Sequence, residues 1–385
     1  MAGFRVVRPF LLAFLVAAAL PYWGVQPAQT GLMTAGRGQP AADAVNPVSI
    51  GSIWRDPGEI ASLDLAFGSG GRAHAPREDA TYSFVKEDLG GTSAKFYVQD
   101  DAGVEWLVKV GDEARGETAA TRLVWAMGYF TDEDYFVREL HVSGLGKLHR
   151  HSKSIHKDGT ITNARLKRHA KKQKKVANWG WADNPFRGSR ELNGLRVMMA
   201  LINNWDLKTV NNKVYAAKRK QESDELGARD RQERPGGGDA EAKESEARPV
   251  GEVPDGENVR YVVSDLGASF GRTGAFFSRS KGKWQDFTKD KFIGATTPET
   301  VDFVMRTRPG KMVRFFKPGY SRGRVAMAAT VEDIPRADAK WIGAQLARLR
   351  PEQIRSAFQA SGFTAQEVDA YVAELNKRIA QLNAL

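Results

Sequence analysis

The chain has 385 residues, 42% of them hydrophobic, which is enough for two domains of ordinary size or one two-lobed unit and excludes wholesale disorder. It contains no cysteine, which excludes disulfides, thiolate nucleophiles, iron–sulfur clusters and cysteine-based zinc sites. Lys and Arg (57) outnumber Asp and Glu (46), and the net charge of +11 favours anionic partners such as nucleotides, nucleic acids or phospholipid surfaces.

The first 25 residues have the layout of a secretory signal, because Arg5 and Arg8 precede a short apolar run over residues 9–20. Extension of the run through Val25 would make a marginal membrane anchor, so a cleaved signal peptide and a retained anchor both stay open. Either one places the bulk of the chain outside the cytoplasm, as a secreted, periplasmic or membrane-anchored protein. Residues 26–50, rich in Gly, Ala, Gln and Pro, are predicted to form a flexible linker.

A β-rich domain is predicted over residues 51–142. Its strands are expected at 82–87, 95–99, 105–110 and 135–140, and a Gly-centred turn over 88–93 joins the first two. Between the last two strands, apolar residues recur at helical spacing and predict a helix over 114–127 that ends at Gly128.

Residues 143–175 are polar and basic and are predicted to connect this domain to a helical one over 176–385. The basic cluster from Arg165 to Lys175 indicates a solvated face or a contact with a polyanion. In the second domain a helix is expected over 190–202, and short strands at 214–215 and 261–263 enclose residues 217–258. This stretch has many charges and no aromatic side chain, so we expect a disordered insertion in a hairpin.

The last ninety residues are predicted to be mostly helical. Pro351 suits a first helical turn, and Gly362 suits a helix stop. Thr364 and Glu367 have the spacing of a capping box, which predicts that a final helix begins between them.

The stretch over residues 203–212 carries the strongest chemical signal. Asp206 and Asn211 lie five residues apart between a predicted helix and a strand, with Lys208 between them, and a later strand ends at Asp265 before Leu266 and Gly267. Phosphoryl transfer from ATP needs a carboxylate for the nucleophile, oxygen ligands for magnesium and a lysine to neutralise phosphate charge. The sequence therefore predicts a phosphotransferase site.

The pattern Asp-x-Lys-x-x-Asn followed by Asp-x-Gly resembles the catalytic and metal-binding loops of the protein-kinase-like fold. No His-Arg pair precedes Asp206, and the stretch over 265–271 is similar to the atypical branch that holds phosphatidylinositol kinases, HipA-like kinases and secretory-pathway kinases. The resemblance covers roughly residues 80–280. It implies an α+β, two-lobed fold with a small antiparallel β-rich N-lobe and a mostly helical C-lobe, and ATP with Mg²⁺ or Mn²⁺ as cofactors.

The resemblance also assigns roles to individual residues. Lys109 would contact phosphate with Glu117 as its partner, although their spacing is tight and leaves Glu113 as an alternative. Asn203 or Asn204 would brace the catalytic loop in place of the missing His-Arg pair. The remaining roles are a phosphate-covering loop of Gly90, Gly91, Thr92 and Ser93, a catalytic Asp206 with Lys208 near the transferred phosphate, and magnesium ligands Asn211 and Asp265.

Taken singly, each of these residues is more often an ordinary cap, turn or surface residue. Their joint occurrence favours an exported phosphotransferase that moves the γ-phosphate of ATP to a protein, lipid or small-molecule acceptor. The alternative is a catalytically silent, kinase-shaped scaffold that binds a polyanion or a partner protein. A nucleic-acid binder rests on charge alone, because the chain lacks the aromatic-interleaved strands that single-strand binders use. The sequence leaves the acceptor and the oligomeric state open.

Overall fold

The computed structural model describes residues 48–91, 93–169, 174–216, 259–272, 280–305, 307, 316 and 318–385. Its contacts separate Met1–Ala44 from a unit over Val45–Leu385, which contains all the described residues. The predicted signal or anchor, nearly all of the linker and the predicted insertion over 217–258 lie outside them. Among the described residues, no helix combines the length and the apolarity that a membrane crossing requires. The α+β class is confirmed.

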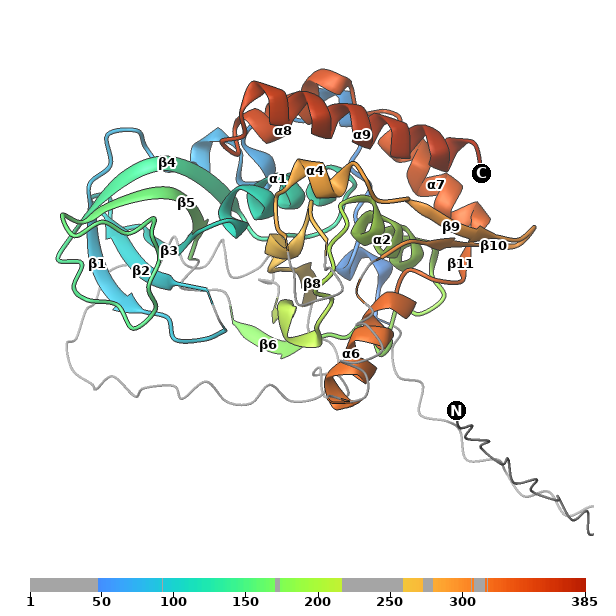
Figure 1. Ribbon diagram of the computed structural model, residues 1–385, viewed down its shortest axis with the longest axis horizontal. Helices are drawn as coiled ribbons and strands as arrows, with labels where there is room; N and C mark the ends of the chain where they lie inside the picture. The colour runs from blue at the N-terminus through green and yellow to red at the C-terminus, as the bar shows by residue number, and fades with distance from the viewer. Residues whose placement is uncertain are drawn as a thin grey trace, which may run out of the picture. The chain divides into compact units, whose positions relative to one another are not determined.

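Five strands close into a barrel in the order β1-β2-β3-β5-β4 (Figure 1). Alternate side chains, among them Val98, Trp106, Val108 and Leu166, fill the barrel core, while Lys109 lies on the opposite side of β3. The strands are β1 (Tyr82–Glu87), β2 (Lys95–Asp100), β3 (Glu105–Val110), β4 (Asp134–Ser143) and β5 (Thr160–Arg168). The sequence analysis located all of them except β5.

The stretch over 143–175 was predicted to be a connecting segment, but it contains a strand of the barrel. The β-rich domain therefore extends beyond its predicted end at residue 142. Strand β5 lies between β3 and β4 and completes the barrel. Its outward positions carry Arg165 and Lys167, which makes the strand look like a basic connector in sequence. Both are paired with acids, Arg165 with Glu117 and Asp134 and Lys167 with Asp132. Any polyanion contact must therefore use other basic residues of the cluster, of which Lys171 and Lys172 lie outside the described part of the chain.

Helix α1 (Glu113–Ala126) follows β3 directly and runs between the barrel and the helical region (Figure 1). Its partner α8 (Pro351–Gln359) begins with the predicted proline, and α9 (Ala365–Asn383) begins with the predicted capping box. Gly362 ends the preceding turn with φ of +81°, as the sequence indicated. The other helices are α2 (Arg190–Leu201), α4 (Trp284–Phe287), α6 (Pro318–Ala329) and α7 (Arg336–Leu346).

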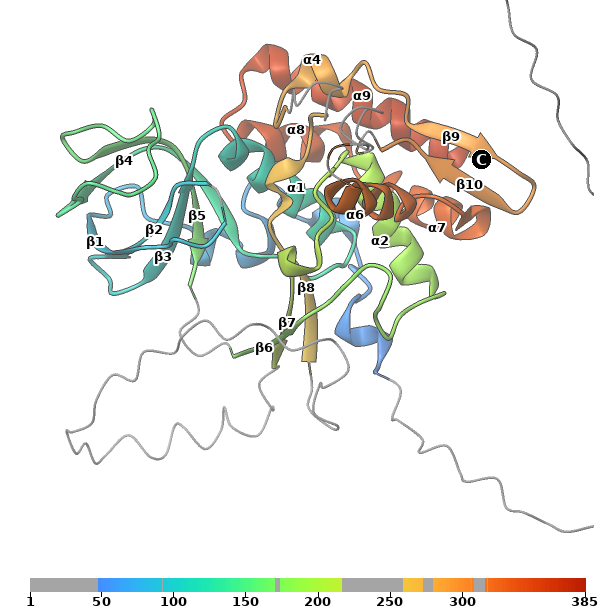
Figure 2. The same cartoon turned by 60° about the horizontal axis from the view of Figure 1, so that its bottom comes forward.

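Two further sheets have three strands each. The first has the order β6-β7-β8, and its β7–β8 hairpin confirms the predicted pairing (Figure 2). The second, β11-β10-β9, was not predicted, because strands of two to four residues show no readable alternation. The strands are β6 (Lys175–Asn178), β7 (Asn212–Ala216), β8 (Val259–Val263), β9 (Ile293–Thr296), β10 (Thr300–Phe303) and β11 (Ile334–Pro335).

Candidate active site

Lys109 is a buried side chain at the centre of a cluster of charged side chains. Its Nζ lies 2.6 Å from Glu113 Oε2, 2.9 Å from Glu117 Oε2 and 2.7 Å from Asp265 Oδ1, and its side chain is 4% exposed. Glu113 and Glu117 are one turn apart on α1, which starts three residues after β3 ends. Both candidate partners of Lys109 therefore contact it, because the short connection brings the first turn of α1 beside the lysine.

Asp265 reaches the cluster through an unusual backbone conformation. Two residues after β8 it adopts the left-handed conformation, with φ 52° and ψ 51°, which costs energy for a non-glycine residue. Gly267 then passes close by, since a Cβ at this position would lie 2.9 Å from a Glu113 oxygen and 3.2 Å from Lys109 Nζ. The Asp265 side chain stays 49% exposed, so one face of its carboxylate is accessible to a ligand.

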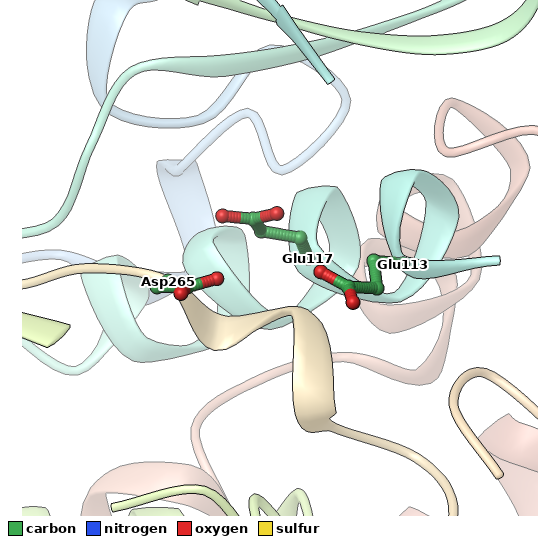
Figure 3. Close-up of side chains that lie close together, drawn as sticks. All are labelled: Glu113, Glu117 and Asp265. Carbon is green, nitrogen blue, oxygen red and sulfur yellow. The ribbon is translucent and has the colours of Figure 1, made fainter. Parts of the chain in front are cut away.

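The three carboxylates lie close together (Figure 3). One ligand oxygen from each falls within 4.8 Å of the others, a spacing that could hold a metal ion. In this arrangement, however, the Lys109 ammonium bonds all three. Arg165 lies 3.5 Å from Glu117, and Lys281 contacts Glu113, so three cations balance the three acids.

The pKa values follow from this pairing. Burial opposes ionisation of Glu113, but Lys109 and Lys281 lower its pKa to about 2. Burial also opposes ionisation of Asp265, yet Lys109 holds the pKa of this carboxyl below its usual range. Burial lowers the pKa of Lys109, but the three acids outweigh that effect and raise it. Glu113, Asp265 and Lys109 are therefore charged at neutral pH.

Acid should weaken the fold through these carboxylates. A depressed folded-state pKa adds stability that is complete above the unfolded-state pKa and is lost as pH falls through the folded value. For Glu113 this stability is lost as pH falls from 4.5, the ordinary pKa of the group, to about 2, its pKa in the folded protein. The difference between the two pKa values corresponds to about 3 kcal/mol of unfolding free energy at most. Urea unfolding at pH 7, 5, 4 and 3 should show a falling free energy of unfolding below pH 4.5. The Glu113→Gln variant should show a shallower fall, and an equal slope in both proteins would contradict the assignment.

Asp206 lies in a second group, on the loop that follows α2. Lys208 Nζ is 2.8 Å from Asp206 Oδ2, and the Asn211 side-chain amide donates to the Asp206 carbonyl at 2.8 Å. This hydrogen bond holds the Asn211 side-chain nitrogen in place. Asn211 Oδ1 accepts no hydrogen bond from the described residues and remains available as an oxygen ligand. The Asp206 side chain is 21% exposed and the Lys208 side chain 51%, so both are accessible from solvent.

The two asparagines before Asp206 brace its loop. The Asn203 amide donates to the Gly271 carbonyl at 2.5 Å and to Asp290 at 3.2 Å, which ties the loop to the segment after Asp265. Asn204 Oδ1 accepts a hydrogen bond from the Asp206 backbone N–H at 3.3 Å. Both residues therefore contribute to the bracing that the sequence analysis assigned to one or the other.

Strand register brings the two groups to one end of the β7–β8 hairpin. Asn212 pairs with Val263, so Asn211 immediately precedes the ladder on one strand and Asp265 closely follows it on the other. Lys281 also bridges the groups, because its Nζ contacts Glu113 and lies 5.6 Å from the ring centroid of Trp205.

Arg324 on α6 is a site residue that the sequence analysis missed. Its Nη1 lies 3.7 Å from Asp206 Oδ1, its guanidinium lies 5.2 Å from the Trp205 ring centroid, and its Nε donates to the Thr307 carbonyl at 3.1 Å. The side chain is 5% exposed. A single arginine so far along the chain from Asp206 has no spacing signal that could have revealed it.

Arg150 was also missed, and it fixes the turn between β1 and β2. Its Nη1 donates to the carbonyls of Asp88, Gly90 and Ser93 at 3.0–3.3 Å, and its Nη2 contacts the carbonyl of Leu89. Ser93 Oγ in turn donates to Glu113 Oε1 at 3.0 Å. Gly90, Gly91 and Ser93 therefore lie on a turn that reaches the Lys109 cluster, while Thr92 lies outside the described residues.

Most of the predicted site residues are thus assembled into two neighbouring groups, one around Lys109 and one around Asp206. Comparisons with protein-family models, with curated proteins and with solved structures found no match to this chain.

Proposed function

We propose that this chain is an exported, kinase-like phosphotransferase that moves the γ-phosphate of ATP to a protein, lipid or small-molecule acceptor. The observation that carries the proposal is the convergence of Lys109 from β3, Glu117 from α1 and Asp265 from the end of β8. In this proposal the barrel and α1 form an N-lobe, and the region from β6 onward forms a mostly helical C-lobe. The N-terminal signal-like sequence supports export.

Each residue has a distinct task in the proposed reaction. Asp206 would orient the acceptor hydroxyl and take its proton, while Lys208 and Lys109 would neutralise phosphate charge. Asn211 and Asp265 supply an amide oxygen and a carboxylate, which are donors that suit Mg²⁺ or Mn²⁺. When bound there, the metal would neutralise charge on the ATP phosphates.

One observation favours the catalytically silent scaffold. The Lys109 ammonium donates hydrogen bonds to Glu117 and Asp265 and lies 2.6 Å from Glu113, so three carboxylates occupy the space that a phosphate would need. Nucleotide binding therefore requires that one carboxylate release the lysine. Asp265 is the candidate, because its side chain is half-exposed whereas those of Glu113 and Glu117 are 14% and 2% exposed.

ATP should raise the melting temperature of the full chain only when magnesium or manganese is present. Asp265 would turn from Lys109 to help hold the metal, which would leave the lysine free to contact phosphate. At about 100 times Kd, the added stability is about 2.7 kcal/mol, which corresponds to a shift of several degrees. A thermal-shift series with ATP, EDTA and each divalent ion measures this. Equal shifts with and without the ions would contradict the metal assignment, and no shift with any nucleotide would favour the scaffold.

Replacing Arg324 by Gln should slow phosphate transfer about 10- to 100-fold while leaving Mg-ATP binding nearly unchanged. Arg324 contacts Asp206 rather than the Lys109 cluster, and a small displacement of a reacting carboxylate is enough for such a loss. The matched control is Arg322→Gln, an exposed arginine on the same helix. Steady-state kinetics should show the effect in kcat, and an effect confined to the KM for ATP would contradict this placement.

A further inference from the structure

A second candidate site lies in a cavity of about 540 Å³ that none of the proposed site residues lines. It is lined by β4, by the segment over residues 66–82 and by the end of α8 near Ala360, and it is open to solvent on one side. Its volume is that of a typical small-molecule pocket. Much of its lining is apolar, including Phe67, Ala75 and Val137, which are only partly buried against the barrel core.

Arg122 on α1 also lines this cavity, and its charge has no ion-pair partner among the described residues. The residue is 3% exposed. Nη1 donates to the Ala357 carbonyl at 3.2 Å and to Ser361 Oγ at 3.3 Å, while Nε is buried without a hydrogen-bond partner. The nearest acids that influence it, Asp134 and Asp64, lie beyond ion-pairing distance, and Asp134 is bonded to Arg165.

A buried cation without an anion is costly, which is why buried charges in proteins are normally paired. Burial accordingly lowers the pKa of Arg122 to about 10, although Asp134 and Asp64 act in the opposite direction. Gly68, with φ of +71°, lets the segment over residues 66–82 approach the Arg122 side chain, since a Cβ at position 68 would lie 3.0 Å from Arg122 Cγ. The fold therefore encloses this arginine closely and still leaves it beside a cavity.

The other charged groups of the lining are exposed. Arg77 is bound to Asp101, and Arg138 adds a further cation from β4. Glu78 and Glu139 also line the cavity, but both are exposed to solvent, where water screens their repulsion of an anion. The buried part of the cavity thus combines apolar walls with Arg122, a cation that has no ion-pair partner among the described residues.

We propose that this cavity binds a small organic carboxylate, with the carboxylate on Arg122 and an apolar body against Phe67, Ala75 and Val137. The carboxylate would supply the anion that the described residues do not provide, through charge-assisted hydrogen bonds to the guanidinium. This site is independent of the proposed phosphotransferase activity, so either can fail without the other.

Calorimetric titration of the full chain with 3-phenylpropionate and hexanoate, beside the corresponding neutral amides, tests the proposal. Both acids should bind at least about tenfold more tightly than their amides, because one charge-assisted contact is worth about that ratio or more. Arg122→Met should weaken acid binding about 10- to 100-fold and leave amide binding unchanged. Arg187→Gln is the matched control, because this exposed arginine does not line the cavity, and it should leave acid binding unchanged.

A second variant keeps the test decisive if Arg122→Met does not fold. Ala75→Phe fills the cavity and leaves Arg122 in place, so it should abolish the binding of acids and amides alike. Equal affinity for acids and amides, no binding to the parent protein, or unchanged acid binding by Ala75→Phe would each overturn the proposal.

Discussion

Asp206→Asn should lose phosphate transfer about 10²- to 10⁴-fold while still binding Mg-ATP, the loss expected when a general base is removed. The amide has the shape of the carboxylate and can still accept a hydrogen bond from Lys208, but it cannot take a proton from an acceptor hydroxyl. Calorimetric titration with Mg-ATP and a radiolabelled-phosphate assay on the same preparation measure the two properties. Asp183→Asn, at an exposed position, is the matched control and should change neither.

Asp265→Asn should fail in a different way. This carboxylate is assigned to the metal and also bonds Lys109, so its loss should weaken Mg-ATP binding itself. If both variants bind and react like the parent, the kinase proposal is wrong. If the parent binds Mg-ATP and transfers phosphate to no acceptor and not to water, the silent scaffold is the better account.

Lys109→Met should lower the free energy of unfolding by about 3 kcal/mol or more in the absence of nucleotide. The substitution removes the shared cation and leaves Glu113 and Glu117 buried beside each other, and breaking a buried pair in this way typically costs about 3–5 kcal/mol. Arg165 remains near Glu117 and favours the lower end of that range. Urea unfolding measures the change, and Lys147→Met, at an exposed position, should stay within about 0.5 kcal/mol of the parent.

The double variant Lys109→Met with Glu117→Gln isolates the cause of this loss. If uncompensated negative charge is the main cost, neutralising Glu117 should recover part of the stability that Lys109→Met removes. A double variant as unstable as the sum of the two single variants would instead mean that the two side chains do not interact.

Local signals predicted most of the elements. Strand-prone residues and a Gly-centred turn located β1 to β3, helical spacing located α1 and α2, and Pro351, Thr364 and Glu367 marked the starts of α8 and α9. Strand β5 was not predicted, because basic side chains occupy its outward positions and make it resemble a polar connecting segment. In the structure these side chains are paired with acids on α1, on β4 and before β4. The β9–β11 sheet was not predicted, because its strands are too short to show the alternation of buried and exposed residues that is typical of a strand.

The candidate site, too, could be predicted from the sequence only in part. The motif over 206–211, the Asp265 turn, Lys109 and the choice between Glu113 and Glu117 could all be read along the chain. That Lys109 bonds both glutamates and Asp265 at once could not, because Asp265 lies 156 residues away from it. Arg150 and Arg324 have no motif, and only the fold shows that they contact the β1–β2 turn and Asp206.

The sequence by itself determined where many of the helices and strands lie and which residue types are available for chemistry, because backbone preferences and hydrophobic periods act over a few neighbouring residues. The tertiary structure alone decided which charges meet and which, like Arg122 beside its cavity, have no ion-pair partner among the described residues. Pairing in a buried site depends on distances of a few ångströms between segments far apart in the chain, and that distance is set by how the barrel, α1 and the helical region pack together.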